Sequence, residues 1–263
     1  MINPLEPKRW DADGTGTVLA QHISFLRDWL RSYKPLTDAQ ADTVEILLEQ
    51  LYRERGITKE TDMSVLRHED FPLLCELYAL LERQAGGSGV FTDETLRELR
   101  LHLHSLCVGP DSLYFNGHTN IGSGRFVTFG VKSLLEAGQN LRDAMLFNIF
   151  SYMNNELLCA GNTVAAIDEL YLYLNNRTAI GYIRACMKRA RKKESSLLLA
   201  SQNVEDFLLP EAAELTKPLF SIPTYQFLFH PGTVDGGKYR EALQLEECEY
   251  GVVRSCARGN CLF

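Results

Sequence analysis

Apolar residues in the first part of the chain recur with the period of an α-helix. The clearest stripe consists of Val44, Leu47, Leu48 and Leu51. These positions fall at i, i+3, i+4 and i+7, which is one face of an amphipathic helix. Thr37 and Gln40 stand ahead of the stripe with the spacing of a capping box. Similar patterns over residues 71–84 and from the N-cap candidate Thr92 onward predict a helical region over residues 13–110.

After Gly109-Pro110 the pattern changes to short apolar runs that alternate with helical stretches. The runs predict strands at residues 125–131, 163–167, 195–202, 224–230 and 248–254. Helices are predicted between them at 136–160 and 178–192, and residues 1–5 are predicted to be the tail of another strand. Strands and helices in alternation indicate an α/β layer with a mostly parallel sheet. We therefore expect three parts: a core strand in 1–12, an all-helical insertion in 13–110, and an α/β core in 111–263.

Composition limits the function classes. The 263 residues carry a net charge of −7, which argues against a surface broadly built to neutralise phosphates. No apolar run reaches the ~20 residues of a membrane span, and the N-terminus has no leader character, so we expect a cytoplasmic protein. The seven cysteines form no C-x-x-C pair, which excludes a zinc knuckle or a redox motif of that type.

One local basic stretch, residues 187–193, runs against the net charge. The stretch is typical of a solvated helix end, where cations complement the carbonyl dipole. It is equally compatible with a functional arginine, and the sequence leaves the choice open.

Polar side chains end two of the predicted strands. Asp168 and Glu169 follow the run 163–167, and Gln202 ends the strand 195–202. Ligands of open α/β sheets bind beyond the carboxyl ends of the strands. There Asp168 could hold Mg²⁺, Glu169 could orient or deprotonate an attacking water, and Gln202 could sense a terminal phosphate.

Two arginines and one absent motif complete the candidate chemistry. Arg189 and Arg191 lie near a helix end, where a guanidinium could reach a phosphate held by a neighbouring subunit, as an arginine finger does. The phosphate-cradling loop G-x-x-x-x-G-K-[S/T] does not occur in the 263 residues. Lys132-Ser133 is the single Lys followed by Ser or Thr, and the glycine positions before it hold Phe126 and Val131.

Five sequence blocks together resemble the conjugative-transfer (type IV secretion) ATPase family. They are INPLE, FNGHTN-x(4)-RFVTFGVKSL, AAIDELYLYL, RARKKESSLLLASQNVEDF and RGNCLF. The resemblance implies an incomplete RecA-like P-loop NTPase core, related to the HerA/FtsK hexameric motors, with a helical insertion. It implies Asp168 and Glu169 as Walker B acids, Gln202 as sensor and Arg189 or Arg191 as finger, with ATP and Mg²⁺ as cofactors. The chain then corresponds to the C-terminal part of such an enzyme, without the P-loop.

This resemblance sets the functional expectations. The first is a fragment of a motor that couples ATP hydrolysis to DNA or protein transfer, inactive alone because the Walker A loop is absent. Its partners would be further ATPase subunits, secretion-channel components and transferred DNA, at the inner face of the cell membrane. The alternative is a non-catalytic assembly module, or a truncated remnant, that docks on full-length subunits.

Overall fold

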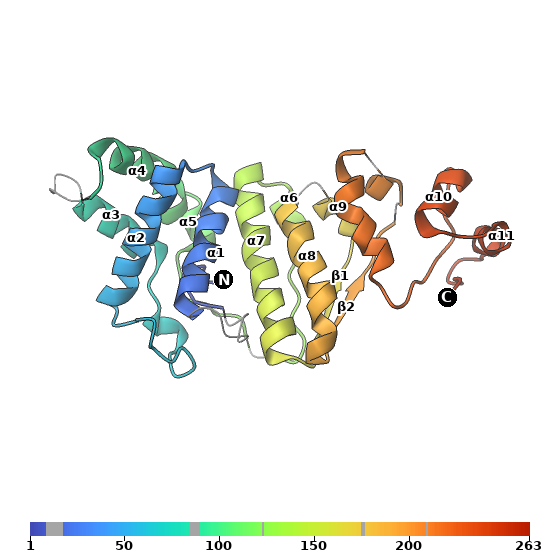
Figure 1. Ribbon diagram of the computed structural model, residues 1–263, viewed down its shortest axis with the longest axis horizontal. Coiled ribbons are helices and arrows are strands. Elements are labelled where there is room, and N and C mark those ends of the chain that lie inside the picture. The colour runs from blue at the N-terminus through green and yellow to red at the C-terminus, as the bar shows by residue number, and fades with distance from the viewer. Residues whose placement is uncertain (9–17, 85–89, 123, 175–176, 203, 209) are drawn as a thin grey trace. The chain divides into compact units, whose positions relative to one another are not determined.

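The computed structural model describes residues 1–8, 18–84, 90–122, 124–174, 177–202, 204–208 and 210–263 (Figure 1). The chain forms two compact units, Met1–Asn155 and Glu156–Phe263. Two glycine-rich stretches of the sequence, residues 14–16 and 86–89, lie outside the described residues. The boundaries expected at residues 12 and 110 stay a prediction. No helix in the described ranges is long and apolar enough to cross a membrane.

The first unit is helical. Its longer helices are α1 (Val18–Tyr33), α2 (Asp38–Glu54), α3 (Leu74–Arg83), α4 (Asp93–Cys107) and α7 (Gln139–Asn155), and its shorter ones are η1 (His68–Asp70), α5 (Ser112–Phe115) and α6 (Lys132–Leu135). In Figure 1, α1 lies beside α7, and α2 packs on α1, α3 and α4. The largest fully buried side chains of the unit are Trp29, Tyr52, Phe115, Leu5, Leu26, Leu47, Leu48, Leu74, Leu77, Leu80, Leu81 and Leu96.

The predicted helix starts are confirmed. The N–H of Gln40 donates to Thr37 Oγ1 (3.3 Å), and the N–H of Thr37 donates back to Gln40 Oε1 (2.9 Å), which completes the capping box. Thr92 caps α4 by accepting from the N–H of Thr95, and acids occupy the first turn. Local signals therefore place these helices before any packing is considered.

The first residues are not a strand, so that prediction was wrong. The side chain of Asn3, which is fully buried, accepts from the N–H of Leu5 and donates to the carbonyl of Pro72. Its backbone N–H donates to Thr119 Oγ1, and Asn148 donates to the carbonyl of Ile2. Side chains and turn hydrogen bonds therefore satisfy the backbone N–H and carbonyl groups of this segment, and its described residues form no strand-to-strand hydrogen bonds.

The predicted strand 125–131 was also wrong. These residues form no strand in the described part of the chain, and α6 begins directly after them. Phe126 is 89 % exposed, while Phe129 packs edge-on against Tyr152. β-Branched and aromatic residues favour a strand only where a partner strand lies alongside.

The second unit holds a parallel strand pair. Its elements are η2 (Glu156–Ala160, a π-helical turn), β1 (Val164–Ile167), η3 (Leu170–Tyr173), α8 (Arg177–Arg189), η4 (Ala190–Lys193), β2 (Ser196–Leu199), η5 (Glu205–Leu208), α9 (Pro210–Ser221), α10 (Gly236–Leu243) and α11 (Glu247–Ser255). β1 and β2 pair in parallel, from Val164 opposite Ser196 to Ile167 opposite Leu199. This confirms both predicted strands and the α/β character with parallel pairing, although the sheet of the described residues has two strands.

Helix α8 is the crossover between the two strands and supplies their packing. Ile180, Ile183 and Cys186 are fully buried on one face of α8, which contacts β2, α9, η2 and η4. The other face of the strand pair is open, since Val164 is 72 % and Leu198 is 56 % exposed. An apolar sheet face that is exposed in this way can be covered by another layer of secondary structure.

Two later strand predictions were wrong. Residues 248–254 belong to α11, whose start is marked by the N–H of Glu246 donating to Glu249 Oε2 (2.9 Å). Residues 224–230 form a single antiparallel bridge, between Leu228 and Leu262. A short apolar run does not distinguish a strand from a helix. For residues 248–254 the better indication was the pair of acids Glu246 and Glu249, which marks a helix start.

Candidate functional site

Two backbone hydrogen bonds join the carboxyl ends of β1 and β2. The N–H of Ala200 donates to the carbonyl of Ile167, and the N–H of Leu170 donates to the carbonyl of Ala200, each at 2.9 Å. These bonds extend the parallel ladder by one step on either side of the two acids. Asp168 and Glu169 therefore emerge at the same sheet end as the residues that follow β2.

Glu169 has a left-handed backbone. Its φ and ψ are 51° and 48°, and its N–H donates to Asp168 Oδ1 at 2.9 Å. This conformation is uncommon for a residue with a long side chain and carries a strain of roughly 1 kcal/mol or more. The turn redirects the chain from β1 into η3 within one residue and fixes the direction of the two carboxylates.

The predicted Glu169 and Gln202 are in direct contact. Gln202 Nε2 donates to Glu169 Oε1 at 2.5 Å, across 33 positions of the chain. The other carboxylate oxygen, Oε2, is buried and has no hydrogen-bond partner among the described residues. A buried carboxylate oxygen without a donor is unfavourable, so this atom is available to a water or a ligand.

Asp168 lies beside this pair and is exposed. One of its oxygens accepts from Glu169, which leaves the other for a cation or its water shell. This donor set fits Mg²⁺, which is bound through one or two carboxylates together with phosphate oxygens. No group of three or more His, Cys, Asp or Glu side chains placed for a metal is found in the described residues.

Tyr173 is a neighbour that the sequence did not single out. Its side chain is buried at the end of η3, and burial raises its pKa, with the charge of Asp168 adding to the effect. The hydroxyl therefore stays protonated at neutral pH. Alternating tyrosines in the block after Asp168 gave no signal that this one would lie beside the acid.

The structure places Arg189 and Arg191 at the opposite end of the strand pair. Arg189 ends α8, and Arg191 is in η4, which leads into the amino end of β2. The N–H of Asn162, just before β1, donates to the carbonyl of Lys193 at 2.9 Å. A four-residue strand is about 13 Å long, so backbone here and at the Asp168–Glu169 turn is separated by about that distance.

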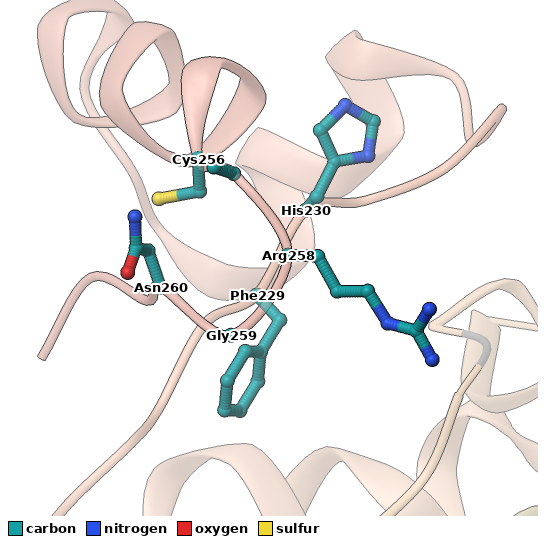
Figure 2. A pocket seen from close by; sticks show the side chains of 7 residues that line it. Phe229, His230, Cys256, Arg258, Gly259 and Asn260 are labelled. Carbon is teal, nitrogen blue, oxygen red and sulfur yellow. The ribbon is translucent and has the colours of Figure 1, made fainter.

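A separate hollow of about 450 Å³ lies between the segment around Phe229 and the turn 256–260 (Figure 2). The Leu228–Leu262 bridge brings these segments together, with both N–H···O bonds at 2.9 Å. Figure 2 shows His230 and Arg258 on one side and Cys256 and Asn260 on the other. None of the predicted site residues lines it, and the chemistry of the strand ends lies elsewhere.

Comparison with known proteins identifies the family. No protein-family model matches the chain, and no curated protein matches it. Among solved structures, VirB4 of Thermoanaerobacter pseudethanolicus is similar over 98 % of this chain and 69 % of that one, with a TM-score of 0.81 and 31 % sequence identity. The chain belongs to the VirB4 family of type IV secretion (conjugative-transfer) ATPases.

Proposed function

We propose that the chain is the Walker B and sensor portion of a RecA-like motor domain, which couples ATP hydrolysis to DNA or protein transfer by a type IV secretion system. The observation that carries the proposal is the Gln202–Glu169 hydrogen bond between the ends of two parallel strands. An acid and an amide so placed can act on the same phosphate and its attacking water.

Each site residue has a distinct part in this proposal. Asp168 would hold Mg²⁺, which would supply positive charge to neutralise the phosphate oxygens. Glu169 positions the attacking water through Oε2, the oxygen that Gln202 leaves free. Gln202 holds the carboxylate through Oε1 and has a second N–H on Nε2 for a phosphate oxygen.

Arg189 or Arg191 acts, in this proposal, on the nucleotide of a neighbouring copy. Both lie at the amino end of the strand pair, so neither arginine shares a strand end with the acids of its own chain. A head-to-tail assembly brings the amino end of one copy to the acids of the next, as in ring-forming motors. We therefore propose a homo-oligomer, located at the inner face of the membrane beside the secretion channel.

The 263 residues contain no P-loop motif, and we propose that they do not turn over ATP by themselves. The backbone N–H groups and the lysine of that loop hold the phosphates in P-loop enzymes, and the sequence contains no such motif. A non-catalytic assembly module remains the second candidate, and the open apolar face of β1 and β2 favours it. Such a module would dock on a complete ATPase subunit through that face.

The test supplies the missing part. A chain extended at its N-terminus by a strand, P-loop and helix from a VirB4 relative should hydrolyse Mg·ATP in a phosphate-release assay. Glu169→Gln should lower that turnover about 10²–10⁴-fold, as loss of a general base does, while labelled ATP still binds. The unextended chain is the control and should release no phosphate.

Two outcomes would contradict the proposal. Turnover by the unextended chain that Glu169→Gln abolishes would show that the phosphates are held without a P-loop. Full turnover by the extended Glu169→Gln variant would remove the role given to Glu169. Inactivity of the extended chain, together with its binding to a complete VirB4 subunit, would favour the assembly module.

A further inference from the structure

Cations are concentrated in one short segment of an acidic chain. Residues 184–194 contain six Lys or Arg and a single acid, Glu194, whereas the whole chain has a net charge of −7. The proposed function uses Arg189 or Arg191 only. The three lysines Lys188, Lys192 and Lys193 have no part in it.

The segment presents its cations on a fixed turn. Cys186 and Ala190 are buried on the packed face, so Lys188 and Lys192, at the intervening positions, point away from it, and both are exposed. The N–H of Ser195 donates to the carbonyl of Ala190 at 3.1 Å, which closes the turn after η4. The amino ends of both strands anchor this turn, so its backbone does not have to be ordered by a ligand.

These cations have no acidic partner in the part of the chain that the structure describes. Lys188, Arg191, Lys192 and Lys193 make no ion pair with any of the residues that the structure describes, and all four are exposed. A helix end carries only about half an elementary negative charge, which does not neutralise four neighbouring cations. An anion with several charges at regular spacing would do so.

We propose that Lys188, Arg191, Lys192 and Lys193 bind the phosphate backbone of double-stranded nucleic acid, which leaves Arg189 as the finger of the proposed function. The chemistry around them favours this partner. A membrane-surface helix exposes apolar side chains beside its cations, whereas the apolar face of α8 is buried in the protein. Single-strand binders stack bases on aromatic rings, and the sole aromatic residue in 177–194 is the half-buried Tyr182.

The salt dependence of such a contact can be calculated. Four phosphate contacts give a slope of about −3.6 for log K against log salt, so a rise from 50 to 200 mM salt weakens binding about 150-fold. The binding carries no sequence preference, because it reads only the backbone. It also needs no nucleotide, so it stands or falls independently of ATP hydrolysis.

The test uses the full 263-residue chain and a fluorescein-labelled duplex of 24 base pairs, with anisotropy measured across that salt range. The triple variant Lys188→Gln, Lys192→Gln, Lys193→Gln keeps both arginines and should reduce the slope to about −0.9, for one remaining contact. A matched control neutralises three exposed cations elsewhere, Lys59→Gln, Arg97→Gln and Lys238→Gln. It should retain the wild-type slope.

Circular dichroism confirms that each variant is folded, and the double variant Lys192→Gln, Lys193→Gln takes the place of a triple variant that does not fold. The proposal is overturned if the wild-type chain does not bind the duplex at 50 mM salt, or if the cluster and control variants weaken binding equally. Vesicles rich in phosphatidylglycerol are the competing probe. Binding to the vesicles without binding to the duplex would also overturn it, in favour of a membrane contact.

Discussion

His22 should make the first unit sensitive to acid. The ring lies fully buried on α1, stacked on Phe25 at 5.5 Å between ring centres and facing the edge of Tyr52. Neither ring nitrogen has a hydrogen-bond partner among the described residues. The backbone of Leu5 and Pro4 lies near enough to favour the protonated imidazole, but this effect is smaller than that of burial. Burial, and secondarily the charge of Lys8, lower the pKa of His22 from 6.5 to about 3.

The direction and size of the effect follow from that pKa. As pH falls, the unfolded chain takes up the proton near pH 6.5 while the folded chain still excludes it, so stability is full above that value and is lost below it. Lowering the pH from 7.5 to 5 should therefore remove about 2 kcal/mol of unfolding free energy through this one residue. The loss continues down to the folded pKa of about 3.

The assay is urea unfolding at several pH values, followed by the fluorescence of Trp29, which is fully buried in the same unit. Trp10→Phe makes Trp29 the single reporter. His22→Phe, in the same background, keeps an aromatic ring and removes the titration, so its stability advantage over the parent should grow by about 2 kcal/mol between pH 7.5 and 5. An advantage that stays constant with pH would refute the assigned burial of a neutral imidazole.

Three further predictions concern the second unit. Gly161→Ala should lower the free energy of unfolding by about 1–3 kcal/mol, because Gly161 has a φ of +70° and a Cβ there would lie 2.8 Å from the carbonyl oxygen of Lys193. Gly181→Ala, in open space on α8, should instead raise it by about 0.5–1 kcal/mol. Equal effects of the two variants in thermal melts would contradict this difference. Gln202→Glu should lower the melting temperature, because it places two carboxylates in contact. The double variant that adds Glu169→Gln should restore the melting temperature, because donor and acceptor are exchanged. Additive losses in the double variant would argue against the contact. The chain should also melt below about 65 °C and aggregate on heating, because the apolar face of the β1–β2 pair is exposed to solvent. A chain that stays folded and monomeric above that temperature would contradict the view that this face needs a further element to cover it.

Elements with a local sequence signal were predicted correctly. The capping box at Thr37 and Gln40 and the apolar stripe behind it define α2 without reference to the rest of the chain. The apolar runs that became β1 and β2 were recognisable because both end in polar residues and are separated by a helix of crossover length. Both runs were expected to end at candidate site residues, and in the structure the parallel pairing brings Glu169 and Gln202 into a contact that was not predicted.

Features that depend on residues far apart in the chain were not predicted. Residues 125–131 have strand composition, but no strand pairs with them in the described chain. The seam between α1 and α7, where Trp29 Nε1 donates to the carbonyl of Ala144 at 2.9 Å, joins residues 115 positions apart and leaves no trace in local periodicity. The left-handed backbone at Glu169 was equally invisible, because glutamate is a poor signal for that conformation.

The parallel pairing of β1 and β2 also determines when the candidate site can exist. Val164 and Ser196 are 32 positions apart, so no hairpin can nucleate the pair, and the chain between them must be closed as a loop before any ladder bond forms. We therefore expect the Asp168–Glu169–Gln202 group to assemble together with the docking of α8. Hydrogen exchange at the amides of Leu170 and Ala200, which close the ladder beside the acids, would report directly on how often a folded chain carries a formed site.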